Sequence, residues 1–380
     1  MRSQADPVAD ALPSSPAAGG RVGTPRWRRL RFIPVAFAVL ALVLGLWTGL
    51  QRLGLPLPGG EAIGAFHGAL MIAGFLGTVI SLERAVAVGR WWAYAAPCLS
   101  AAGALALIAG MPELGAFAFL AAGGVLFVIS VGIAVRELAL FTVMLAVGAA
   151  CWLFGTWSWL TGASMPVAAG WWLDFLILTI AAERLELSRL VRVSAVSQAA
   201  FAALMLLLLI GSARGELEGE WALFTAAGLI GCATWLMRHD IARRTIRQPG
   251  QPRFSAVAIL AGHGWLGVAG AVLLIVPPAT APFSYDATVH AITIGFVLSM
   301  IFGHAPIILP AVTGMRVRSN TFAYAPLALL HASVALRVIS DLFAWVDLRA
   351  ASGTLTVLAL LAYAATLIVA SRTKPASRAT

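Results

Sequence analysis

The stretch HAITIGFVLSMIFGHAPIILP, residues 290–310, is an apolar run with a histidine near each end. A run of this length crosses the hydrocarbon core of a bilayer, which takes about 20 apolar residues as a helix. His290 and His304 are 14 positions apart, which on an α-helix is about 21 Å of rise and about 40° short of four full turns. The two imidazoles are therefore expected on one face at two depths, too far apart to bind one metal ion.

The rest of the chain has the same apolar character. Of its 380 residues, 60% are hydrophobic and 11% are charged, whereas a soluble domain carries about 25% charged residues. About twelve apolar segments of roughly 18–25 residues follow one another with short connections. We therefore predict an all-α polytopic membrane protein, with about twelve transmembrane helices in one bundle over residues 32–372 and the lipid bilayer as its surroundings.

Both ends of the chain are expected to lie outside this bundle. Residues 1–31 are rich in Pro, Ala, Ser, Gly and Arg, which predicts a disordered N-terminal tail. Residues 373–380 are expected to form a short C-terminal tail. The first apolar run has no small-residue cleavage site behind it, so we predict an uncleaved first helix.

The formal net charge of +10 has a topological explanation. In a soluble protein this charge would suggest nucleic acid as a partner, but here most arginines fall in short loops on one side of the predicted membrane. Most acidic residues fall on the other side. The positive-inside rule then predicts a multi-pass protein of the bacterial inner (cytoplasmic) membrane with both termini cytoplasmic and no nucleic-acid partner.

Five of the six histidines fall into two layers when depth is counted from the ends of the predicted spans. His67 and His290 lie within about 8 Å of the outer edge, whereas His263, His304 and His331 lie about 13 Å from the cytoplasmic edge. Two opposed imidazoles suit the axial positions of a haem, and three converging neutral imidazoles suit copper, zinc or a haem with one distal histidine. The alternative is that each histidine hydrogen-bonds a neighbouring helix.

Other polar residues in the spans also have two possible explanations. Arg337 lies near the depth of the outer layer, where it could bind haem propionates or pair with Asp341 four residues later. Glu83–Arg84 and Glu183–Arg184 lie at the ends of two spans, 100 residues apart. The repeat could come from an old duplication, or from long charged side chains that reach the membrane interface independently at both places. Asp174 could relay protons or bond Trp171 or Trp172.

Two prolines interrupt the stretch quoted above. Pro306 has no amide hydrogen, so it should free the carbonyl of Phe302 and kink the helix. The kink could steer His304 toward its neighbours, or Pro306 and Pro310 could end the span.

Three stretches, FHGALMIAGFLGTVI, HAITIGFVLSMI and LLHASVALRVI, resemble segments of the NnrS family. Members of that family are twelve-span bacterial membrane proteins linked to the nitric oxide response and reported to contain haem and copper. The resemblance implies that His67 and His290 correspond to family histidines, with His304 and His331 matched less directly. It implies haem and possibly copper as cofactors, and a small gaseous ligand such as nitric oxide.

These observations favour a membrane haem protein of NnrS type that handles or senses nitric oxide. If the protein is an enzyme, we expect an oxidoreductase acting on nitrogen oxides. Haem–copper oxidases also have twelve spans, but the adjacent His-His pair that their copper site needs is absent from the sequence. Two alternatives stay open: a metal-free proton-coupled transporter relying on Glu83, Asp174 and Glu183, or an assembly factor for a respiratory oxidase.

Overall fold

The computed structural model describes residues 31–189, 193–213, 221–313 and 321–372. The predicted tails, residues 1–31 and 373–380, lie outside this part of the chain except for Arg31. The described residues contain 12 helices long and apolar enough to cross a membrane and no β-strand. The predicted all-α polytopic bundle is thereby confirmed.

The spans follow the chain in order. They are α2 (Phe32–Arg52), the second span Ala62–Val88 (α3, His67–Ala69; η2, Leu70–Gly77; α4, Thr78–Val88), α5 (Ala95–Ile108), α6 (Pro112–Arg136), α7 (Leu140–Leu160), α8 (Met165–Ser188), α9 (Ala195–Ala213), α10 (Trp221–His239), α12 (Gln251–Ile275), the tenth span Ser284–Pro310 (α13, Ser284–His290; η6, Ala291–Leu298; α14, Ser299–Thr313), α15 (Tyr324–Leu342) and α16 (Val346–Arg372).

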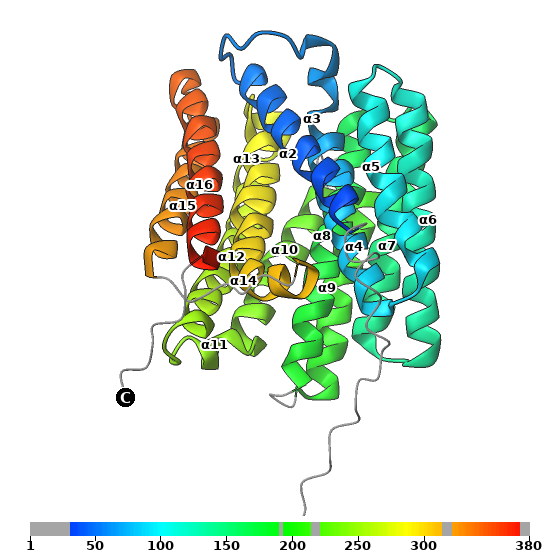
Figure 1. The fold of residues 1–380 in the computed structure, drawn as a ribbon. Coiled ribbons are helices and arrows are strands. Elements are labelled where there is room, and N and C mark those ends of the chain that lie inside the picture. Colours follow the sequence, from blue (N-terminus) through cyan, green and yellow to red (C-terminus); the bar gives the residue numbers. More distant parts are fainter. Residues whose placement is uncertain (1–30, 190–192, 214–220, 314–320, 373–380) are drawn as a thin grey trace, which may run out of the picture.

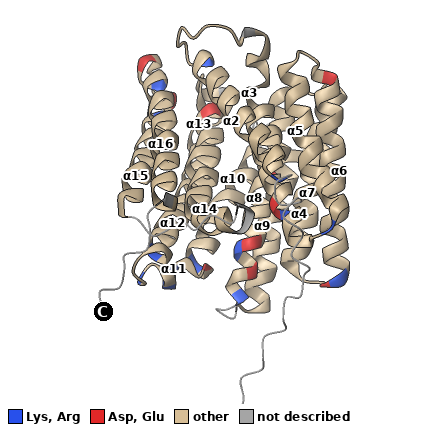
Figure 2. Ribbon diagram, viewed as in Figure 1, with Lys and Arg blue, Asp and Glu red and all other residues tan. Residues whose placement is uncertain are grey.

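Consecutive spans pack side by side along most of the bundle (Figure 1). The start of α2 and the end of α16 lie on one side of the bundle, called the proximal side below, and the opposite side is called distal. The short helix α11 (Ala242–Thr245) lies on the proximal side, between α10 and α12. Most basic residues in the described part gather on the proximal side (Figure 2), so the charge asymmetry in the sequence corresponds to the two ends of the bundle.

The second, sixth and tenth spans meet in the interior. Helix α8 contacts both η2 and η6, and α14 contacts α4. Small residues allow other close approaches: a Cβ added to Gly115 on α6 would lie 2.9 Å from the carbonyl oxygen of Gly103 on α5. Such contacts between small residues are typical of membrane helices.

The second and tenth spans share one irregularity. Segments η2 and η6 are both π-helical and eight residues long. The residue after each segment carries a hydroxyl that donates 2.6 Å to a glycine carbonyl four residues earlier, Thr78 to Gly74 and Ser299 to Gly295. Isolated π-helical turns are rare and often accompany functional sites. Here each begins within three residues of a candidate haem ligand.

The π-helical turn corrects one expectation about the tenth span. Segment η6 lies between His290 and His304, so the rotation between them is not that of an ideal α-helix. Each residue accommodated in a wider turn shifts the helical phase by about 100°. The shared face predicted for these two histidines therefore does not hold.

Pro306 frees a carbonyl as predicted, and the freed acceptor is satisfied by another span. Helix α14 continues through Pro306 and Pro310, so neither proline ends it. The Tyr363 hydroxyl on α16 donates a hydrogen bond of 2.5 Å to the carbonyl oxygen of Phe302. The Ser255 hydroxyl on α12 donates one of 2.6 Å to the next carbonyl, that of Gly303.

Candidate functional site

His67 lies on the second span with its ring packed against α2. Its Nδ1 is 2.7 Å from the carbonyl oxygen of Gly45, and because a carbonyl can only accept, Nδ1 carries the proton. A Cβ on Gly49 would lie 2.7 Å from Cε1 of this ring, so the glycine is what lets the imidazole lie so close to α2. The arrangement leaves Nε2 with its lone pair, as in a metal-ligating histidine oriented by a backbone carbonyl.

His290 has the same tautomer. Its Nδ1 donates to the carbonyl oxygen of Asp286, one turn earlier, at 2.8 Å. His290 lies close enough to His67 for the two rings to interact electrostatically. Both rings are half-buried. The structure thus brings the predicted outer pair into one region and leaves both Nε2 atoms able to bind a metal.

Open space lies beside the second span near His67. A Cβ added to Gly64 or Gly68 would meet no other atom within 4 Å. Gly64 also lines a distal pocket together with Thr48 and Arg52 of α2. Arg52 is exposed there and is within electrostatic range of His67, so a positive charge stands at the distal end of this space. The sequence alone gives no indication of this position for Arg52.

A largely buried ion network holds the distal ends of the last three spans together. Arg337 donates to Asp341 at 2.7 Å and to Asp286 at 3.3 Å. Arg349 donates to Asp286 at 2.7 Å and also to Asp341. The predicted Arg337–Asp341 pair is therefore confirmed as part of a larger set, in which two arginines face two aspartates.

Two members of this network lie close to the starts of their helices. Asp286 lies in the first turn of α13, and Arg349 lies in the first turn of α16. Arg349 is only 7% exposed and also lies over the Phe283 ring, with its guanidinium carbon 3.4 Å from the ring centroid. Burial is tolerated because each charge has hydrogen-bonded partners of opposite sign.

The structure does not bring His263, His304 and His331 together as a metal site. Nδ1 of His331 accepts a hydrogen bond of 3.0 Å from Nε1 of Trp265. Nδ1 of His304 donates to the carbonyl of Met300 at 2.7 Å, whereas Nε2 of His263 lies 3.6 Å from Asp240. Within the described residues, no group of three or more His, Cys, Asp or Glu side chains could hold a metal ion.

His263 instead belongs to a buried cluster that the sequence did not reveal. Asp240 follows α10, and its Oδ2 lies 3.6 Å from Nε2 of His263 and 3.7 Å from Nε of Arg184. The amide of Ala242 donates to the other carboxylate oxygen at 2.8 Å. Burial raises the pKa of Asp240, and the Arg184 charge and the Ala242 amide lower it by less. The sequence offered only one weak sign, an acidic residue inside an otherwise basic connection.

His239, the sixth histidine, lies outside both predicted layers and forms contacts of its own. It is the last residue of α10, is half-buried, and its ring stacks on Trp235 with centroids 4.5 Å apart. Its Nε2 lies 3.2 Å from the Ser197 hydroxyl. These contacts give it a structural role in joining α9 to α10.

Two further acidic residues lie on the sixth span. Arg84, at the proximal end of the second span, donates to Glu183 of α8 at 3.3 Å, so the two matching sequence ends are in contact. Asp174 is 3% exposed and lies beside Ser212 of α9. The indole of Trp172 donates to Thr156 instead, and Oδ2 of Asp174 has no hydrogen-bond partner among the described residues.

Comparisons with known proteins give one match. A family model described as "Domain of unknown function (DUF8744)" matches residues 29–372. No curated protein and no solved structure matches the chain. The matched range includes all twelve spans, and with them both outer histidines and the ion network.

Proposed function

The chain belongs to the DUF8744 family, and for this member we propose an integral membrane haem protein whose iron is held by His67 and His290. One observation carries the proposal. Each imidazole donates its Nδ1 proton to a backbone carbonyl, at 2.7 and 2.8 Å, which fixes the ring and leaves Nε2 as the ligand atom. A haem held by two histidines supplies a one-electron redox centre.

The surroundings of the two histidines fit a flat macrocycle. The rings are half-buried within the bundle, and the neighbouring Gly64 and Gly68 present no side chain to the open space beside them. Haem carries two anionic propionates, and the exposed Arg52 at the distal pocket would receive them. Arg337 is engaged by Asp341 and Asp286. It would therefore act on the site through Asp286, whose carbonyl holds His290.

The biological setting of the proposal comes from the sequence. The resemblance to the NnrS family makes nitric oxide the small ligand to test first, and a role in nitric oxide handling the function to test. We propose the bacterial inner membrane as its location, with the proximal side in the cytoplasm, because most arginines gather on that side. The proposal includes no copper site, because His263, His304 and His331 have three different partners.

A visible spectrum with haem quantification of the purified full-length protein tests this function. The expected result is a low-spin haem in the wild type that disappears in His67→Ala and His290→Ala, while both variants still insert into the membrane. His239→Ala is the matched control, because that histidine contacts Ser197 and Trp235 on the proximal side, and it should keep the spectrum. A colourless wild-type protein, or haem retained without His67 and His290, would refute the proposal.

A second candidate, the proton-coupled transporter, is favoured by Asp174. This carboxyl group lies in the middle of a span, is 3% exposed, and has one oxygen without a partner among the described residues. Burying it costs free energy, and ionisable residues inside membrane spans usually have a function. In this reading the purified protein is colourless, and Asp174→Asn abolishes proton-coupled uptake in vesicles without lowering the amount of inserted protein. The spectrum described above therefore decides between the two candidates first.

A further inference from the structure

A pocket opens on the proximal side where four spans meet, away from the candidate haem site. Its walls come from the start of α12, from Pro306 of α14, from the start of α15 and from the last turns of α16. Its volume is about 360 Å³, within the range of about 300–1,000 Å³ that is usual for small-molecule sites. Nothing in the proposed haem function uses this pocket.

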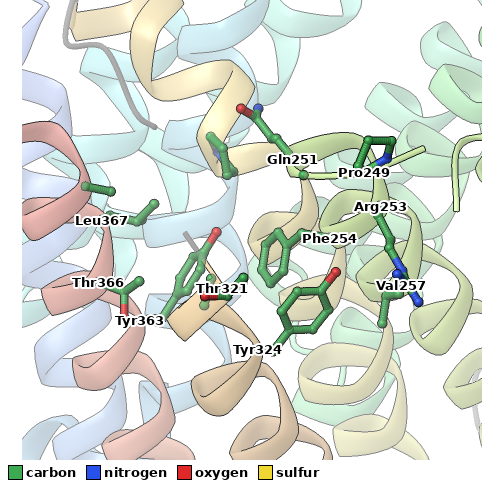
Figure 3. Close-up of a pocket in the computed structure, with 14 residues that line it drawn as sticks. Pro249, Gln251, Arg253, Phe254, Val257, Thr321, Tyr324, Tyr363, Thr366 and Leu367 are labelled. Carbon is green, nitrogen blue, oxygen red and sulfur yellow. The ribbon is translucent and has the colours of Figure 1, made fainter. Parts of the chain in front are cut away.

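The walls of the pocket are aromatic, and their side chains are packed against one another. Phe254, Tyr324 and Tyr363 converge on it (Figure 3). The Phe254 and Tyr324 rings meet edge to face with centroids 5.3 Å apart, and Tyr363 stacks on Phe302 at 3.8 Å. Because Tyr363 is also fixed through its hydroxyl, this wall is a preformed apolar surface.

The mouth of the pocket is positive. Arg253 is exposed at its edge, and none of the fourteen described residues that line it is acidic. Helix α12 begins at Gln251 without a side-chain cap, and α15 begins just after the lining residue Thr321. The N-terminal ends of these two helices therefore add partial positive charge to that of Arg253.

The level of the pocket across the membrane indicates what kind of anion it binds. Its residues on α16 are Tyr363, Thr366, Leu367 and Ala370, in the last three turns of the final span. This is the level at which hydrocarbon gives way to lipid head groups. A ligand at this level that combines an anionic group with apolar methylenes is a membrane phospholipid.

We propose that this pocket binds one anionic phospholipid, with its phosphate at Arg253 and the first turn of α12. The glycerol and the first acyl methylenes then lie against Phe254, Tyr324 and Tyr363. A free phosphate ion would use the same positive mouth but would gain nothing from the aromatic wall, so the wall favours the lipid. The proposal is independent of haem.

Native mass spectrometry of the delipidated full-length protein in mild detergent tests this site. Phosphatidylglycerol, phosphatidylethanolamine and inorganic phosphate are added in separate titrations. We expect one phosphatidylglycerol to bind with at least about tenfold preference over phosphatidylethanolamine, since an additional net charge on the ligand strengthens hydrogen bonds to a guanidinium. Inorganic phosphate at the same concentration should neither bind measurably nor displace the lipid.

Two variants test the two parts of the pocket separately. Arg253→Gln removes the charge, and Thr366→Phe fills the space without changing charge; each should weaken phosphatidylglycerol binding about tenfold or more. Arg244→Gln, on α11 on the same side but outside the pocket, is the control and should leave binding unchanged. Wild-type affinity in both test variants, equal loss in the control, or displacement of the lipid by inorganic phosphate would each overturn the proposal.

Discussion

Tyr363 donates a hydrogen bond of 2.5 Å to the carbonyl oxygen of Phe302, and so connects the last span to the tenth. The acceptor exists because Pro306, four residues later, has no amide hydrogen to offer it. Buried backbone carbonyls without a partner are costly, especially in a membrane where water cannot replace the missing donor. The tyrosine therefore satisfies a carbonyl that the proline leaves unpaired.

Tyr363→Phe should lower stability by about 1–3 kcal/mol, the cost of leaving a buried acceptor unpaired. Thermal unfolding in detergent measures the effect. Tyr94→Phe is the matched control, because the buried Tyr94 hydroxyl has no partner among the described residues and its removal should cost nothing. Equal destabilisation by the two variants would contradict the role given to Tyr363.

The distal ion network predicts strong coupling between its members. Asp341→Asn leaves the buried Arg337 and Arg349 with Asp286 as their one remaining carboxylate in the network. Breaking a buried pair in this way costs about 3–5 kcal/mol. Removing Arg337 as well, in the double variant with Arg337→Gln, should restore part of the loss. If the double variant is as unstable as the sum of the single variants, the four side chains do not act as a unit.

Asp240 predicts a pH dependence of stability. Burial raises its pKa in the folded protein above the value of about 3.9 for an unfolded aspartate. The folded state therefore holds the proton more tightly, so the contribution of Asp240 is greatest at low pH and is lost as pH rises through the raised value. Asp240→Asn cannot titrate, and its melting temperature should fall less over that pH range than that of the wild type.

The control for Asp240 is Glu137→Gln. Glu137 forms an exposed pair with Arg189, with side chains 57% and 53% exposed, and such pairs contribute little to stability. Its pH dependence should match the wild type. A difference between Asp240→Asn and the wild type that is no larger than this control would show that Asp240 is not the group responsible.

Two glycines near His67 predict opposite outcomes for haem binding. A methyl group at Gly68 meets nothing within 4 Å, whereas one at Gly49 would lie 2.7 Å from the His67 ring. Gly68→Ala should therefore keep the haem, while Gly49→Ala should displace the ring and reduce the haem-to-protein ratio. Gly68→Leu should also lose haem, by filling the open space, without loss of inserted protein. Full haem content in Gly49→Ala would mean that the position of His67 against α2 is not required.

The orientation of the bundle can be tested by thiol labelling. In a Cys98→Ser background, which removes the exposed native cysteine, Pro56→Cys on the distal side and Gln248→Cys on the proximal side provide exposed positions. With the proximal side in the cytoplasm, a membrane-impermeant reagent should label position 56 but not position 248 in intact cells. The reverse pattern would place both termini outside.

The sequence was sufficient for features that depend on one segment of chain. The number of spans follows from the length of each apolar run, and the carbonyl freed by Pro306 follows from the proline alone. The Arg184–Asp240–His263 cluster could not be predicted, because it joins α8 and α12 through a residue in the connection after α10. The shared face of His290 and His304 was wrong because a π-helical turn leaves no clear trace in hydrophobic periodicity.

The π-helical segments η2 and η6 have a consequence for how such a protein can evolve. A wider turn holds one residue more than an α-helical turn. It therefore sets the angle, about the helix axis, between the side chains that precede it and those that follow it. Losing a single codon within η2 would turn His67 by about 100° relative to Glu83. No substitution outside the segment could reverse that rotation. The angular relation between the distal and proximal halves of these two spans is therefore altered by insertions and deletions, and alignments of relatives should show gaps at these two places.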